Sequence, residues 1–268
     1  ASVTIPGSVE SLGEHAFSGC EALKTVAIPD SVRTIGEDAF SGCSSLTSFT
    51  VGSANTAFSA RYGALYNKAG TTLLRYPENK QGEVVFPASI KTIGDRAFSG
   101  CRGVEKPVLP NSVTSIGESA FMSCGSLTEI TIPAGVTSIG NSAFTSCDSL
   151  KRILFYGTEQ QWESISQFSG AGSVRVVCNY DGTIPLAILS NPGSFVIQKG
   201  ESITLSVEAD GTGLTYQWYY KKADSDTWSV WKNRTHASET VTPNDSWNGI
   251  QLFCKVKDSA GSSLRSGV

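Results

Sequence analysis

Apolar residues return at a fixed spacing along the first two thirds of the chain. Each unit is anchored by an Ala-Phe pair with a Cys three residues after the Phe, at Phe17, Phe40, Phe98, Phe121 and Phe144. The steps between these rings are 23, 58, 23 and 23 residues, and 58 equals two units of 23 plus 12 further residues. One unit of this length cannot bury an apolar face alone, so the pattern predicts the stacked coils of a solenoid.

Each coil is expected to contain two short extended segments and one turn. Apolar and polar residues alternate at 26–28, which predicts a strand, and Pro29 ends it because proline cannot donate to a sheet. Residues 32–35 predict a second extended segment that is closed by Gly36. Residues 37–40 are expected to form a short helical or 3₁₀ turn.

The long step between Phe40 and Phe98 contains an insertion at about 53–83. Within it, residues 62–77 form two apolar runs on either side of a turn from Asn67 to Gly70. This arrangement predicts a β-hairpin.

A C-terminal cap of the solenoid is expected over about 155–180. Thr158 and Gln161 have the spacing of a capping box, which predicts a helix over about 159–166. Trp162 is interpreted as the lid of the last apolar layer, with a ligand platform as the alternative.

The pattern I-G-x-x-A-F-x-x-C-x-x-L-x-x-I-x-I-P-x-x-V resembles the BspA-type leucine-rich repeat of bacterial surface proteins over roughly residues 1–180. The hairpin at 62–77 is similar to an insertion that is frequent in that family. The resemblance implies adhesion to host or bacterial surfaces and an extracellular or cell-surface location.

Short alternating strands separated by turns predict a second, all-β domain after the solenoid. This segment resembles an immunoglobulin-like β-sandwich, with Trp218 and Cys254 in the positions of its core tryptophan and second cysteine. Two departures are Leu205, which stands where the partner cysteine is expected, and Leu252, which stands at the tyrosine corner.

The expected fold class is therefore a β-rich chain with two domains. A leucine-rich-repeat solenoid is expected over 1–182 and an immunoglobulin-like sandwich over 186–268. The chain opens within a repeat and ends at Val268 within the expected last strand, so we expect it to be a fragment of a longer protein.

Composition argues against several classes of partner. The net charge is −3, charged residues make up 17% of the chain, and Lys and Arg form no block, which does not favour a nucleic-acid partner. The apolar runs are too short for a transmembrane segment.

No constellation of catalytic residues is visible. The two histidines, His15 and His236, belong to different expected domains, and the cysteines lack metal-site spacing. The phosphate-binding glycine motifs are missing as well. We therefore expect no enzyme activity, no cofactor and no metal.

Seven cysteines cannot all pair internally. Those that recur once per coil are expected to form a buried row of reduced thiols, because free Cys packs as a small hydrophobe. A disulfide between neighbouring coils is compatible with the distance between adjacent strands.

The exposed strand positions vary between coils, as a binding surface would. The candidates for ligand binding there are Lys24, Thr25, Ser48, Lys106, Glu129 and Arg152. In the second domain, Trp228 and Trp231 are candidates for glycan stacking, with coverage of sheet edges as the alternative.

These features favour a non-catalytic, cell-surface or secreted adhesion protein that binds a protein or glycan through the solenoid. The alternatives are a carbohydrate-binding appendage of a larger secreted enzyme and a structural spacer.

Overall fold

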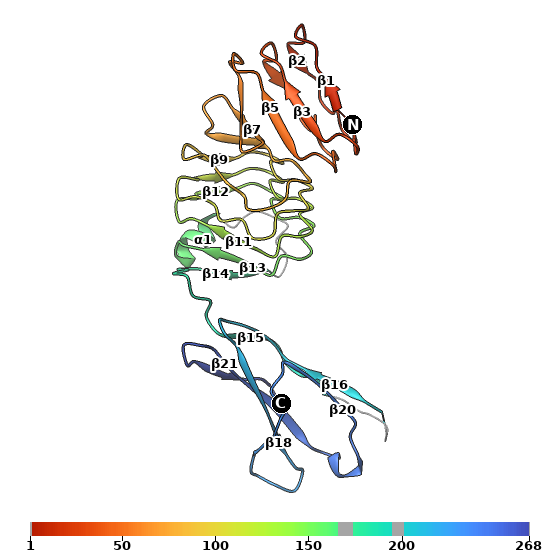
Figure 1. The fold of residues 1–268 in the computed structure, drawn as a ribbon. Coiled ribbons are helices and arrows are strands. Elements are labelled where there is room, and N and C mark those ends of the chain that lie inside the picture. Colours follow the sequence, from red (N-terminus) through yellow and green to blue (C-terminus); the bar gives the residue numbers. More distant parts are fainter. Residues whose placement is uncertain (1, 166–173, 195–200, 268) are drawn as a thin grey trace. The chain divides into compact units, whose positions relative to one another are not determined.

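The computed structural model describes residues 2–165, 174–194 and 201–267. It divides into two compact units, Ala1–Tyr180 and Asp181–Val268, each of which is described by itself (Figure 1).

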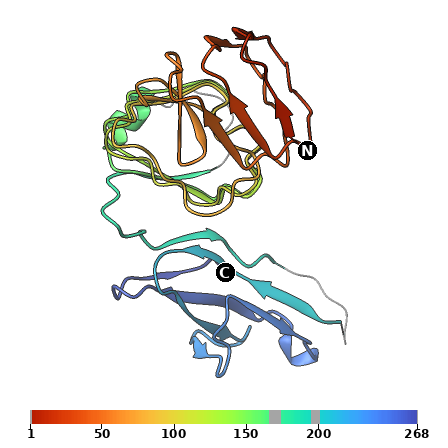
Figure 2. The ribbon, with the colours of Figure 1, turned by 45° about the horizontal axis from the view of Figure 1, so that its top comes forward.

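The first unit is a β-solenoid, as the repeat predicts. One row of strands comprises β1 (Ser2–Thr4), β3 (Thr25–Ile28), β5 (Ser48–Val51), β11 (Glu129–Ile132), β13 (Arg152–Phe155) and β14 (Arg175–Val177). A second row comprises β2 (Ser11–Leu12), β4 (Thr34–Ile35), β8 (Thr72–Arg75), β9 (Thr92–Ile93), β10 (Ser115–Ile116) and β12 (Ser138–Ile139). Strands of successive coils pair in parallel, and the coils drawn from yellow to green superpose as a ring in Figure 2.

Stacked aromatic rings form the centre of the solenoid core. Phe121 lies between Phe98 and Phe144, with ring centroids 4.8 and 5.6 Å apart and nearly parallel planes. Phe121 is 0% exposed, which confirms that the coils on either side enclose it. Tyr76 extends the stack at 4.8 Å from Phe98, although the repeat pattern did not assign it a place.

The turn before each Phe differs from the helical turn expected from the sequence. Asp38 has a φ of 52°, and its counterparts have the same left-handed backbone: His15, Arg96, Ser119 and Ser142. A left-handed residue cannot continue a right-handed helix. The chain therefore makes an isolated hydrogen-bonded turn at this corner of each coil.

Glycine after the second strand is required by the close approach of the neighbouring coil. A Cβ atom at Gly36 would lie 2.4 Å from the backbone nitrogen of Glu14, and one at Gly140 would lie 2.4 Å from that of Glu118. Any side chain would force the coils apart at this point.

The insertion forms a three-stranded antiparallel meander. It contains β6 (Phe58–Arg61) and β7 (Ala64–Asn67), and β7 pairs in turn with β8. The turn between β7 and β8 is closed by the Gly70 N–H, which donates to the Asn67 carbonyl at 2.9 Å. The hydrophobic pattern of the sequence does not predict β6.

The end of the solenoid carries the helix α1 (Glu159–Ile165). The capping box forms in both directions: Thr158 N–H donates to Gln161 Oε1 at 2.8 Å, and Gln161 N–H donates to Thr158 Oγ1 at 3.2 Å. Residue 166, where the helix was expected to end, lies outside the described residues. Among the described residues, no helix is long and apolar enough to span a membrane.

The second unit consists of small antiparallel sheets. Two pairs are β15 (Ala187–Ser190) with β17 (Glu208–Asp210) and β16 (Ile203–Ser206) with β20 (Ser238–Val241). A four-stranded sheet has the order β19 (Ser229–Val230), β18 (Thr215–Lys221), β21 (Gln251–Lys257), β22 (Ser263–Arg265). The buried core of the second unit includes Trp218, Cys254 and Leu205. Trp218 and Cys254 are paired across β18 and β21.

Candidate functional site

A groove of about 900 Å³ opens on the solenoid where the second row of strands is interrupted. Strand β4 pairs with β2, whereas β8 pairs with β9 on one side and with β7 of the insertion on the other. The insertion therefore occupies the place that β4 would take beside β8. The groove is lined by the turn after β4, by the insertion and by residues of β8, β9, β10 and β12.

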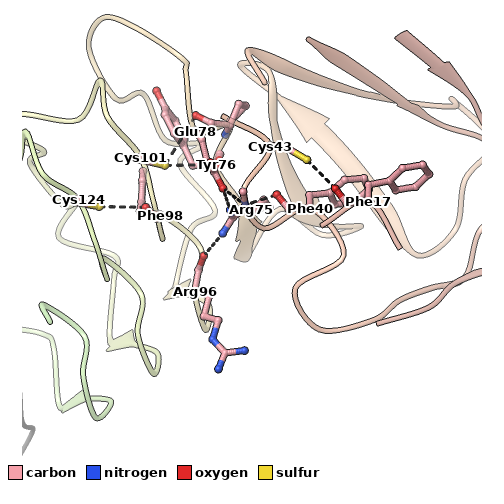
Figure 3. A network of polar contacts seen from close by, with 12 residues as sticks. Phe17, Phe40, Cys43, Arg75, Tyr76, Glu78, Arg96, Phe98, Cys101 and Cys124 are labelled. Carbon is pink, nitrogen blue, oxygen red and sulfur yellow. Dashed lines mark hydrogen bonds and ion pairs between the residues drawn. The ribbon is translucent and has the colours of Figure 1, made fainter. Parts of the chain in front are cut away.

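A buried arginine connects the coils on the two sides of this interruption. Arg75 Nη2 donates to Glu78 Oε1 at 2.5 Å, and Arg75 Nη1 donates to the carbonyl of Arg96 at 2.8 Å (Figure 3). Glu78 Oε1 also accepts a hydrogen bond from the backbone N–H of Gly42 at 2.8 Å. Since both side chains are less than 10% exposed, this ion pair is a structural link, and removal of one partner would leave a buried charge uncompensated.

Four carboxylates line the groove, and we call them the rim carboxylates: Glu37, Asp38, Asp95 and Glu118. Arg96 pairs with Glu37 and with Asp38, where the Nη1 to Oδ2 distance is 2.8 Å. Asp95 Oδ1 accepts a hydrogen bond from the backbone N–H of Glu118 at 2.7 Å. The Glu118 carboxylate makes no hydrogen bond or ion pair with any residue that the structure describes. The groove therefore carries an excess of negative charge.

Hydroxyl groups and small side chains line the strands of the groove. Thr72, Thr92, Ser115 and Ser138 contribute one hydroxyl from each of four strands. Ser115 Oγ donates to Thr92 Oγ1 at 3.0 Å. The lining aromatic rings, such as Phe40 at 3% exposure, are buried and offer little free face for stacking on a sugar.

Three of the predicted ligand-binding residues lie on the sheet of β1, β3 and β5. Lys24 and Thr25 are exposed, and Ser48 is half-buried. Thr25 and Ser48 are direct neighbours across β3 and β5.

The other three solenoid candidates lie in the following coils. Glu129 and Arg152 face each other across β11 and β13 and form an ion pair, so each satisfies the charge of its neighbour. Lys106 is exposed and lines a smaller pocket of about 350 Å³. None of the six predicted residues lines the large groove. The only sequence signal for the groove is the irregular 58-residue step, which marks the insertion but not its effect on the stack.

Trp228 is surrounded by other side chains of the second unit. Its ring lies edge-on to Phe253 at 4.7 Å. The Arg265 guanidinium lies 4.6 Å and the Lys221 ammonium 5.7 Å from its centroid. The two contacts with Arg265 and Lys221 are cation–π pairs. The Trp228 ring is therefore engaged in packing within the second unit.

Trp231 has a similar environment. It packs edge-on against Trp247 at 5.1 Å, and the Arg234 guanidinium lies 5.3 Å from its centroid. At the end of the solenoid, Trp162 packs at 5.3 Å from Phe155, as expected of a lid on the last apolar layer.

The two histidines lie in different units and in different environments. His15 is exposed in a turn of the solenoid, and His236 Nδ1 lies 3.2 Å from Glu239 Oε1. Among the described residues, no group of three or more His, Cys, Asp or Glu side chains is arranged to hold a metal ion.

The seven cysteines, all within the described residues, carry free thiols. Within the solenoid, the Cys43 thiol donates to the Phe17 carbonyl at 3.2 Å, and the Cys124 thiol donates to the Phe98 carbonyl at 3.1 Å (Figure 3). Burial raises the pKa of Cys43 to about 11. The neighbouring Cys147 thiol and burial likewise raise the pKa of Cys124. Cys43 and Cys124 therefore act as neutral packing groups that link one coil to the previous one.

Cys20 departs from the predicted buried row because it is exposed. Its counterparts Cys43, Cys124 and Cys147 donate to the Phe carbonyl of the preceding coil, and the described chain places no such coil beside Cys20.

The chain matches the family model described as the BspA type leucine rich repeat region at residues 1–79 and 74–175, which is more than half of its length. A search of curated proteins found no match.

Several solved structures, including the following three, are similar to the chain. A leucine-rich repeat protein from Eubacterium ventriosum is 32% identical, with 66% of this chain and 48% of that chain covered and a TM-score of 0.57. A leucine rich cell surface protein from Faecalibacterium prausnitzii is 30% identical, with 63% and 57% covered and a TM-score of 0.42. The pneumococcal vaccine antigen PcpA is 21% identical, with 65% and 49% covered and a TM-score of 0.52.

The chain spans about half the length of the Eubacterium protein. The repeat pattern, the stacked rings and the match to the family model agree over residues 1–175. The chain therefore belongs to the family of BspA-type leucine-rich repeat regions.

Proposed function

We propose that this chain is a non-catalytic interaction module of a bacterial cell-surface or secreted protein, which binds a protein or glycan partner through its solenoid. The observation that carries the proposal is a stack of coils with a large groove at its interruption. Repeat solenoids commonly use such extended surfaces for binding. The surface location rests on the resemblance of the repeat to those of bacterial surface proteins, and adhesion is the corresponding biological role.

The polar groups of the solenoid support binding over catalysis. Arg75 and Arg96 are held in ion pairs with neighbouring carboxylates, and the thiol of Cys43 is kept neutral by burial. Side chains in such ion pairs stabilise the structure of the surface. A catalytic nucleophile or base, in contrast, needs a neighbouring group that activates it.

For the second unit, we propose an immunoglobulin-like sandwich that acts as a spacer or platform for the solenoid. The central pair β18 and β21, the outer strands β19 and β22, and the separate pair β16 and β20 support this assignment. Trp218, Cys254 and Leu205 in one core support it further. A crystal structure in which the β16–β20 pair did not pack face to face with β18 and β21 would contradict it.

Binding of the full chain to arrays of glycans and of surface and matrix proteins tests the function. We expect saturable binding to at least one array member, and reversal or neutralisation of the charge of exposed solenoid residues should weaken it. The pair Lys24→Glu and Lys106→Glu tests the predicted strand surface, and the pair Asp95→Asn and Glu118→Gln tests the groove. Binding that none of these variants alters, or no binding at all, would contradict a solenoid interaction module.

The same arrays test the carbohydrate-binding alternative. Glycan binding that is lost in Trp228→Ala or Trp231→Ala but kept in the solenoid variants would assign the ligand to the second unit. The packing of both rings against cations and neighbouring aromatic residues favours the opposite result.

A further inference from the structure

The interruption of the solenoid leaves one coil with an open backbone edge. In the other coils, a backbone N–H after the second strand donates to the coil before it: Gly36 donates to the Leu12 carbonyl at 2.9 Å, and Gly117 donates to the Ile93 carbonyl at 2.8 Å. Ile35 occupies the same position in β4, but β4 has no following strand beside it. In the described part of the chain, no backbone N–H from a following coil reaches the Ile35 carbonyl.

In the turn after β4, the groups that lack a partner are backbone N–H donors rather than a carbonyl acceptor. At this corner each coil normally donates to the next, as where Phe17 N–H donates to the Ala39 carbonyl and Phe98 N–H to the Ala120 carbonyl, both at 2.7 Å. The N–H of Phe40 has no hydrogen-bond partner among the described residues, although Phe40 is 3% exposed. Because backbone groups in protein interiors are almost always hydrogen-bonded, this edge is an acceptor and donor site without a partner.

This open edge forms one wall of the groove. Ile35, Asp38 and Phe40 all line it, and the N–H of Asp38 is unpaired in the same way as that of Phe40. An extended chain that lies along β4 could accept from these N–H groups and donate to the Ile35 carbonyl. Strand addition of this kind is a common mode of peptide recognition, in which main-chain hydrogen bonds provide much of the affinity.

The charges of the groove select the kind of segment. The Arg96 guanidinium already lies between Glu37 and Asp38, which shows the type of group that the rim carboxylates hold. Asp95 and Glu118 carry no such counter-ion among the described residues. An acidic segment would be repelled, whereas a basic one would be attracted and aligned.

We propose that the groove binds an extended, basic polypeptide segment, which adds as a strand to the open edge of β4 and places Lys or Arg side chains at Asp95 and Glu118. This inference rests on the proposed binding function and names the class of partner. The lining hydroxyls of Thr92 and Ser115 suit such a segment because they are small and can bond to its polar atoms.

Selection from a phage-displayed library of random short peptides on the full chain tests this proposal. We expect the enriched peptides to carry an excess of Lys and Arg at alternate positions. Their affinity should fall about tenfold for the Asp95→Asn, Glu118→Gln variant. The matched control is Glu21→Gln, Glu105→Gln, which removes the same charge from two exposed residues outside the groove and should keep the affinity.

Backbone N-methylation of the best peptide separates strand addition from simple charge attraction. Because only alternate N–H groups of a strand face one neighbour, methylation of one alternate set should abolish binding, and methylation of the other set should be tolerated. Bound peptide should also slow hydrogen exchange of the amides of Asp38 and Phe40 in the wild-type chain.

The proposal is overturned if no peptide is enriched, if enriched peptides lack the basic excess, or if the two alternate methylations have equal effects. These results leave the proposed function standing when the arrays still show partners of the solenoid. Array binding that fails together with peptide selection would contradict both.

Discussion

At the scale of single residues, one position per coil determines the stacking of the solenoid. Phe98, Phe121 and Phe144 form nearly parallel rings. The cysteines that follow the second and third of these rings, Cys124 and Cys147, each add a thiol hydrogen bond to the carbonyl of the previous Phe. Tyr76 occupies a ring position in the interrupted coil and leaves its hydroxyl without a partner among the described residues. The stack of the later coils therefore extends to Tyr76 at the end of the insertion, at the expense of one unsatisfied polar group.

Replacement of Phe121 by Ala tests the ring stack. Because Phe121 is fully enclosed, we expect a loss of about 3–5 kcal/mol in the free energy of unfolding, measured by chemical denaturation. Phe17→Ala is the matched control, since Phe17 occupies the same repeat position but is half-buried and should cost less. Equal losses, or a loss below about 1 kcal/mol for Phe121→Ala, would contradict the stacking register.

The buried thiols predict a loss of stability at alkaline pH. Burial raises the pKa of Cys101 to about 12, whereas the pKa of a thiol in the unfolded chain is about 8.5. Between these values the unfolded state releases a proton that the folded state keeps, so the free energy of unfolding falls as pH rises from about 9 towards 12. Below this range both states are neutral, and the full contribution is present.

Urea denaturation at a series of pH values measures this effect. The free energy of unfolding should fall less steeply with rising pH in Cys101→Ala than in the wild type, and an equal decrease in both would contradict the prediction. Thiol titration of the unfolded wild-type chain without reductant should detect close to all seven thiols. Detection of two or fewer would reveal disulfides between coils.

At the scale of elements, repetition and its interruption have different consequences. Parallel pairing from β9 to β12 repeats one set of contacts, so each strand completes the hydrogen bonds of the previous one. The meander of β6, β7 and β8 breaks this series, and β4 loses its following strand. An insertion that looks like a local loop in the sequence therefore creates the groove.

The capping box of α1 gives a prediction at this scale. Thr158→Ala should lower the free energy of opening of α1, measured by hydrogen exchange, by about 0.5–2 kcal/mol. The reason is that the N–H of Gln161 loses its hydrogen bond to the Thr158 hydroxyl. Gln161→Ala removes the reciprocal bond. The double variant should cost less than the sum of the two single variants, since both belong to one motif; strict additivity would show that the pair does not act as a capping box.

At the scale of the whole molecule, the two units have separate cores. The clusters around Phe121 and around Phe40 belong to the solenoid, and the cluster around Trp218 belongs to the second unit. Each unit therefore contains the apolar contacts that its own folding requires.

Hydrogen exchange of a Trp218→Ala variant tests this independence. Trp218 is 0% exposed, and its removal should raise exchange rates throughout 201–267 by about a hundredfold or more, which corresponds to about 3 kcal/mol or more. Exchange in the solenoid coils should stay as in the wild type. Faster exchange around Phe121 in this variant would show that the units are energetically coupled.

The sequence by itself determined the solenoid, its capping box and the all-β character of the second unit. These features depend on side chains that recur at a fixed spacing, such as Phe121, or on hydrogen bonds between residues close in the sequence, such as that of Thr158 with Gln161. Only the tertiary structure decided which surface is hollow and which aromatic rings are free. The position of the insertion beside β4 and the packing of Trp228 depend on contacts between segments far apart in the chain, and no local pattern encodes them.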